Sequence, residues 1–121
     1  MNEVDQLDGP ATPQWVRELI GAWNRGDREA VLAHLSDEIV VDSPGVAGEP
    51  GRVSLPPGKA AFRESFQLFR ERRPTFELVS VLASDVSASL VLLDNDGRNL
   101  TLLLALDDGG KVRQITVYRP G

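Results

Sequence analysis

Four extended runs follow one another in the second half of the chain, and this succession limits the folds that are open to it. Pro74 stops a helical pattern, and from Thr75 onward the spacing of the apolar residues is extended rather than helical. Short turns made of serine, aspartate, asparagine and glycine separate the runs. The runs are Phe76–Ala83, Val86–Leu93, Leu100–Leu106 and Val112–Arg119. Because hairpins are the shortest way to join such runs, we expect an antiparallel meander.

The first half of the chain predicts two helices joined by a tight turn. Thr12 and Pro13 are typical of a helix start, as N-cap and first helical residue. The apolar residues that follow recur at helical spacing and give the helix one apolar face: Val16, Leu19, Ile20 and Trp23. The run Asn24-Arg25-Gly26-Asp27 ends this helix at a glycine. It also supplies Asp27 as N-cap of a short second helix, which we expect to end near Ser36.

A strand, an irregular connection and a third helix complete the order of elements. We expect the strand at Glu38–Asp42, followed by a long connection, residues 43–57, that is rich in proline and glycine. Loops of this length serve as lids over binding sites or as surface loops without a role, and both interpretations stay open. The third helix is expected at about Gly58–Arg72. Its aromatic residues recur at spacings of four and three: Phe62, Phe66 and Phe69.

This order of elements predicts an α+β fold, in which helices gather on one face of a mostly antiparallel sheet. The early strand is expected to join the sheet formed by the four later runs. Residues 1–12 are interpreted as a loose leader, and residues 13–121 as a single domain. A curved sheet wrapped around the helices would leave a conical cavity between them.

Composition narrows the range of functions. The 121 residues suffice for one domain, and a net charge of −5 argues against nucleic acid, whose phosphates require a basic face. The chain has no cysteine and one histidine, so we expect no thiolate chemistry and no metal site. We also expect no cofactor. No apolar run reaches the roughly 18 residues of a membrane span. The acidic start lacks a signal core, which favours a cytoplasmic location.

Two short motifs, in this order of elements, carry a resemblance to a known superfamily. Asn24-Arg25-Gly26-Asp27 lies between the first two helices, and Gly58-Lys59-Ala60-Ala61-Phe62 opens the third. Over residues 14–120 the chain resembles the NTF2-like superfamily, and within it the ketosteroid isomerases and SnoaL-like polyketide cyclases. The resemblance implies three N-terminal helices packed on a curved, mostly antiparallel sheet around a conical pocket.

The same resemblance implies that the catalytic groups of ketosteroid isomerases are replaced here. Leu19 stands where those enzymes have a tyrosine on the first helix, and Leu102 where they have a second acid. Ser43 stands where the aspartate base belongs, with Asp42 one residue early, and Phe66 replaces a supporting tyrosine. Asp42 could act as a base only if a β-bulge turned it into the cavity. Otherwise it is an exposed carboxylate beside a turn.

Three classes of function remain open. The first is binding of a small apolar molecule in the pocket. The second is a lyase, isomerase or cyclase acting on a polycyclic or ketone-bearing substrate, with Asp42 as general base. The third is an interaction module that forms a homodimer through the outer face of the sheet and has no ligand. The residues expected to bind a ligand are Leu19, Trp23, Ser43, Phe62, Phe66, Leu102 and Arg119.

Overall fold

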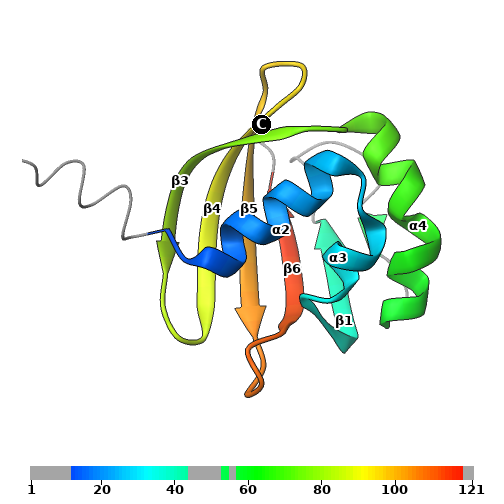
Figure 1. The fold of residues 1–121 in the computed structure, drawn as a ribbon, viewed down its shortest axis with the longest axis vertical. Helices are drawn as coiled ribbons and strands as arrows, with labels where there is room; N and C mark the ends of the chain where they lie inside the picture. The colour runs from blue at the N-terminus through cyan, green and yellow to red at the C-terminus, as the bar shows by residue number, and fades with distance from the viewer. Residues whose placement is uncertain (1–11, 44–52, 55–56, 119–121) are drawn as a thin grey trace, which may run out of the picture.

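The computed structural model describes residues 12–43, 53–54 and 57–118, without the side chains of residues 43, 53 and 54. Within this part of the chain, three helices lie on one face of a six-stranded sheet (Figure 1). The helices are α2 (Gln14–Arg25), α3 (Arg28–Leu32) and α4 (Lys59–Arg72). The predicted α+β class, with three helices against a mostly antiparallel sheet, is confirmed.

The sheet has the strand order β2-β1-β6-β5-β4-β3. All neighbouring strands are antiparallel except β1 and β6, which are parallel. The strands are β1 (Leu35–Ser43), β2 (Val53–Ser54), β3 (Phe76–Ala83), β4 (Ser87–Asp94), β5 (Asn99–Leu106) and β6 (Val112–Tyr118). The predicted meander is therefore confirmed as β3 to β6. The early strand joins the same sheet, as expected, and the structure places it beside β6.

Several predicted boundaries differ from those in the structure, two of them because of sheet pairing. The second helix ends at Leu32 rather than near Ser36, and β1 begins at Leu35, because the backbone there pairs with β6 at Val112. The connection 43–57 contains the two-residue strand β2, which sequence reasoning missed. The N-cap of α2 is Pro13 instead of Thr12. The expected leader and most of the connection 43–57 lie outside the described residues.

Irregular pairing curves the sheet around α2 (Figure 1). The register shifts between Leu78 and Ser80 on β3, between Ala105 and Leu106 on β5, and between Leu35 and Val40 on β1. A bulge bends its strand and increases the local twist, so these shifts turn the concave face of the sheet toward the helices.

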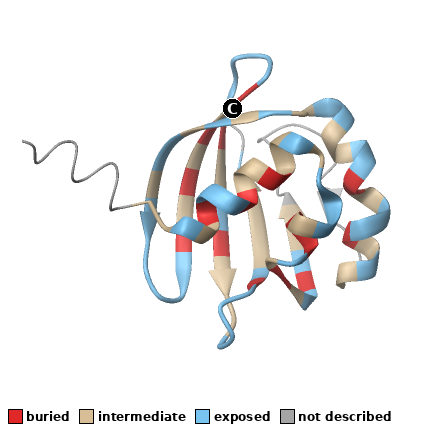
Figure 2. Ribbon diagram, viewed as in Figure 1, coloured by how far each residue is buried: buried red, intermediate tan, exposed pale blue. Residues whose placement is uncertain are grey.

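The core lies between that concave face and the helices. On β4 the residues alternate, and Ala88, Leu90 and Leu92 are buried with Asp94 at the end of the strand. The buried positions of α2, among them Val16, face the same core (Figure 2). Every second side chain of β4 and the apolar face of α2 therefore pack against each other in one apolar layer.

The Asn24-Arg25-Gly26-Asp27 motif organises the end of α2. Gly26 caps the helix in the left-handed region, at φ 73°. The Asp27 carboxylate accepts a hydrogen bond from the Ala30 backbone N–H (3.2 Å) and caps α3, as predicted. The Asn24 side chain donates to the Phe76 carbonyl (2.9 Å) and accepts from the Phe76 N–H (2.8 Å). The motif therefore fixes the helix turn and also the first residue of β3.

Arg70 on α4 completes this junction. Its Nε donates to the carbonyl of Trp23 (2.8 Å), and its Nη2 donates to the carbonyls of Asn24 (2.9 Å) and Pro74 (3.4 Å). Carbonyls at a helix C-terminus lack partners within the helix, so the guanidinium satisfies groups that would otherwise be left unpaired. The C-terminal ends of α2 and α4 are thereby held against the start of β3.

Replacing Gly26 by alanine should destabilise the protein more than the same change at Gly97. Both glycines have positive φ, 73° and 79°, so each alanine should cost about 1–2 kcal/mol of left-handed strain. A Cβ at Gly26 would also lie 2.8 Å from Nη1 of Arg70, whereas one at Gly97 would meet nothing within 4 Å. Displacing the hydrogen-bonded guanidinium should add about 1–3 kcal/mol. Urea unfolding measures the loss of stability in each variant. Equal losses would contradict a stabilising role for the hydrogen bonds of Arg70 at this junction.

Candidate ligand-binding site

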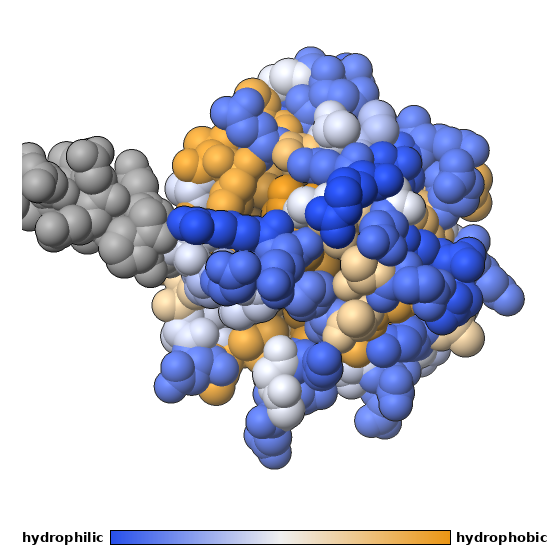
Figure 3. All heavy atoms as spheres, viewed as in Figure 1, coloured by the Kyte–Doolittle hydropathy of each residue, from blue (hydrophilic) through white to orange (hydrophobic). Residues whose placement is uncertain are grey.

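A cavity of about 210 Å³ lies between the helices and the concave face of the sheet. In Figure 3, apolar side chains gather above α2, over the upper part of β3 to β5. All but two of the lining residues are aliphatic or aromatic. They are Leu19, Ile20, Trp23, Val31, Leu35, Val41, Phe62, Phe69, Arg72, Arg73, Phe76, Leu92, Leu100, Leu102, Leu104, Ile115 and Val117. Such a lining suits an apolar ligand.

The structure brings four of the predicted binding residues together around this cavity: Leu19, Trp23, Phe62 and Leu102. Phe66 is not in the lining. It is buried, and its ring packs edge-on against Trp23, with ring centroids 5.1 Å apart and planes at 66°. Phe66 therefore supports the cavity wall from behind. The side chain of Ser43 and the whole of Arg119 lie outside the described residues.

Asp42 does not line the cavity. Beyond the irregularity in β1, Val41 pairs with Ile115, and both residues line the cavity. Asp42 pairs with the next residue of β6, Thr116, which lines a hollow on the opposite face of the sheet. Since successive side chains on a strand alternate between faces, Asp42 belongs to the outer face.

Two arginines at the end of α4 line the cavity, and sequence reasoning did not assign them to it. Both stand at the C-terminal end of α4, where positive side chains complement the helix dipole. Arg73 lies four residues after Phe69, so it continues the spacing of the aromatic stripe on α4. That spacing was the signal that could have identified it.

A buried carboxylate positions Arg73. Oδ2 of Asp94 lies 3.4 Å from Nε of Arg73, and the Asp94 side chain is 3% exposed. Its Oδ1 accepts hydrogen bonds from the backbone N–H groups of Asp96 (2.9 Å) and Arg98 (3.0 Å). The N–H of Arg98, followed by that of Asp96 and by the charge of Arg73, holds the pKa of Asp94 below its ordinary value, against the opposing effect of burial. Asp94 therefore stays ionised and fixes the guanidinium beside the cavity.

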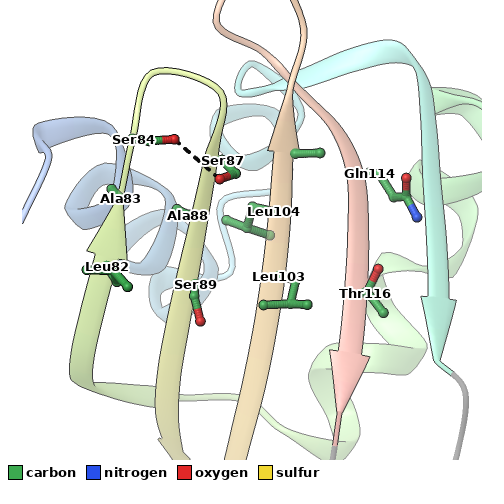
Figure 4. A pocket seen from close by; sticks show the side chains of 11 residues that line it. Leu82, Ala83, Ser84, Ser87, Ala88, Ser89, Leu103, Leu104, Gln114 and Thr116 are labelled. Carbon is green, nitrogen blue, oxygen red and sulfur yellow. Dashed lines mark hydrogen bonds between the residues drawn. The ribbon is translucent and has the colours of Figure 1, made fainter.

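The outer face of the sheet carries a second, shallower hollow of about 470 Å³ (Figure 4). Leu82, Ser89, Leu103 and Thr116 lie across it on neighbouring strands. Leu82 is 79% exposed and Leu103 is 41% exposed. This face is uncharged along β4 and β5, where the outward residues are Ser87, Ser89, Val91, Leu93, Asn99, Thr101, Leu103 and Ala105.

The described part of the chain offers neither a metal site nor a membrane-spanning helix. No group of three or more acidic or histidine side chains gathers there to hold a metal ion. None of the helices described combines the length and apolar character that crossing a membrane requires.

Three helices against a strongly curved sheet, with an apolar cavity between them, define an NTF2-like fold, and solved structures share it. An NTF2-like protein of unknown function from Cytophaga hutchinsonii is 17% identical, with a TM-score of 0.66 over 88% of this chain and 87% of that one. A Mycobacterium tuberculosis protein in complex with estradiol-17β-hemisuccinate is 16% identical, with a TM-score of 0.69 over 88% of this chain and 91% of that one. At these identities the likeness concerns the fold alone.

The family is narrower than the fold. The SnoaL-like domain model matches residues 16–119, and the chain belongs to this family. A SnoaL-like protein of unknown function from Burkholderia thailandensis is 26% identical, with a TM-score of 0.73 over 89% of this chain and 93% of that one. No sequence among curated proteins matches the chain. The resemblance drawn from the sequence motifs is confirmed.

Proposed function

We propose that this protein binds a small apolar molecule in the cavity between α2, α4 and the sheet. The observation that carries the proposal is an open volume lined almost entirely by aliphatic and aromatic side chains. The volume, about 210 Å³, is below the roughly 300–1,000 Å³ of sites that enclose drug-sized ligands. The ligand is therefore small, of about one or two rings. The estradiol hemisuccinate complex of the Mycobacterium tuberculosis protein supports apolar binding in this fold.

Catalysis by Asp42, as a lyase, isomerase or cyclase, is the less favoured alternative. A general base must lie within hydrogen-bond reach of the proton that it removes. The pairing of Asp42 with Thr116 puts its carboxylate on the other face of the sheet from the cavity. Leu19 and Leu102 do line the cavity, but neither side chain can donate a hydrogen bond to developing negative charge. Binding requires none of these groups, so we favour it.

A tryptophan side chain that fills the cavity should weaken ligand binding. A tryptophan at the neighbouring position, on the outer face of the sheet, should not. Leu102→Trp on β5 places an indole in the cavity, whereas Leu103→Trp, one residue later, places it on the outer face. We expect titration with 1-naphthol, followed by calorimetry, to give at least about tenfold weaker binding for the first variant and no change for the second. Circular dichroism checks that both variants fold. Equal affinities in all three proteins, or no binding to the wild type, would overturn the proposal.

A second proposal concerns assembly: the outer face of the sheet forms a homodimer. Its support is the exposed apolar surface around Leu82 and Leu103 and the lack of charge along β4 and β5, since the centres of interfaces are depleted of charged residues. An interaction module without a ligand is disfavoured. Side chains would fill the pocket of such a module, whereas this protein has an open cavity.

Light scattering at micromolar concentration should give a dimeric mass for the wild type and a monomeric mass for Leu103→Lys, because a buried charge without a partner opposes association. The matched control is Leu68→Lys on α4, where the leucine is 66% exposed and far from this face in the fold. A monomeric wild type would contradict the dimer.

A further inference from the structure

We infer that the ligand of this cavity carries a single carboxylate, which Arg72 and Arg73 bind where the cavity meets solvent. This inference rests on the proposed binding function and specifies the chemical class of the ligand. An apolar lining alone would select for size and shape. The two guanidinium groups at one end of it add a requirement for negative charge there.

Arg73 is held in place, and its guanidinium still has N–H groups that can donate hydrogen bonds to a ligand. A guanidinium has five N–H donors, and only Nε of Arg73 faces Asp94, at 3.4 Å. That nitrogen is fully buried and forms no hydrogen bond of normal geometry, so the pairing with Asp94 is electrostatic rather than a close bidentate contact. Among the described residues, neither Nη group of Arg73 has a hydrogen-bond partner. These two Nη groups form the edge of a guanidinium that matches the two oxygens of a carboxylate.

The position of Arg73 is fixed from both sides. Its backbone carbonyl accepts the indole N–H of Trp23 (2.9 Å), and its backbone N–H donates to the carbonyl of Phe69 (3.1 Å). Trp23 and Phe69 both line the cavity, so two residues that would contact the apolar part of the ligand also hold the backbone of Arg73. An acid bound there would meet hydrocarbon and a fixed cation in one site.

The balance of charge at this end of the cavity favours a monoanion. Arg72 and Arg73 contribute two positive charges, and Asp94 neutralises one of them. Arg72 is exposed and makes no ion pair or hydrogen bond within the described residues, so its charge is available to a ligand. The whole chain carries a net charge of −5, so this excess is local and does not reflect a basic protein. Cationic ligands would be repelled, and a neutral ligand would leave the Nη groups of Arg73 without an anionic partner.

The test compares an acid with its neutral isostere: 1-naphthylacetate and 1-naphthylacetamide, both titrated into the full chain by calorimetry. The wild type should bind the acid at least about tenfold more tightly than the amide. Arg72→Gln should reduce this ratio by about threefold or more. Arg72→Gln combined with Arg73→Gln and Asp94→Asn should bring the ratio close to one while the amide still binds. The triple variant removes Asp94 so that no carboxylate is left buried without its partner.

Arg113→Gln is the matched control, since Arg113 is an exposed arginine on β6 that does not line the cavity, and it should keep the wild-type ratio. Equal binding of acid and amide by the wild type would overturn this inference and leave the proposed binding function standing. A preference for the acid that survives in Arg72→Gln and the triple variant would overturn it as well. Failure of both compounds to bind the wild type would overturn the binding function and this inference together.

Discussion

Truncation of Phe66 to alanine should cost about 3–5 kcal/mol of unfolding free energy, the usual range for a buried phenylalanine. Phe66 is 3% exposed and lies midway along α4, between the helices and the sheet. Its ring also meets Trp23 edge-on at 5.1 Å, so the change removes an aromatic contact besides creating a void. Because Trp23 lines the ligand cavity, the void would adjoin it and loosen the cavity wall.

Leu68→Ala on the same helix is the control for Phe66→Ala. Leu68 is 66% exposed, so its truncation should change stability by no more than about 0.5 kcal/mol. Urea unfolding at one temperature gives both values from the same helix. A loss below about 1 kcal/mol for Phe66→Ala would mean that its side of α4 faces an open cavity or solvent.

Isomerisation of a β,γ-unsaturated ketosteroid should be very slow in this protein, despite its fold. Moving a proton beside a ketone requires a base and also donors to the oxygen that gains negative charge. Loss of one such donor typically costs about 10²–10³ in rate. The two positions that would supply donors hold Leu19 and Leu102, and both leucines line the cavity. With both donors missing, turnover should be about 10⁴–10⁶ times slower than in a ketosteroid isomerase that has them, if the two free-energy losses add.

The assay compares the wild type with Asp42→Asn, because Asp42 is the only carboxylate that sequence reasoning offered as the base. We expect the two proteins to have the same low rate, since Asp42 lies on the outer face of the sheet. Rapid turnover that disappears in Asp42→Asn would show that the carboxylate reaches the cavity. It would then replace binding by catalysis as the function.

The identity and order of the elements could be predicted from the sequence because they depend on local chemistry. Gly26 ends a helix because it adopts a positive φ, Asp27 caps the next helix through its own side chain, and Pro74 follows the end of α4. The apolar spacing on α2 and α4 predicted inward-facing side chains, and of these Val16, Leu19, Phe62 and Phe66 are buried. The first residue of β1 could not be predicted in the same way. Leu35 joins the strand because it pairs with Val112 of β6, which lies far away in the sequence.

The residues of the candidate site fall into the same two groups: those placed by local sequence and those placed by tertiary structure. Helical spacing by itself determined that Leu19, Trp23 and Phe62 lie on inward faces, because that spacing is a property of each helix alone. Only the tertiary structure decided which face of the sheet Asp42 occupies: its register against β6 follows an irregularity in β1, and a shift of one residue reverses every side chain that follows. Only the tertiary structure, likewise, turned Arg73 from a charge at a helix end into part of a cavity. Its ion pair joins it to Asp94 at the end of β4, a residue that is distant in the sequence.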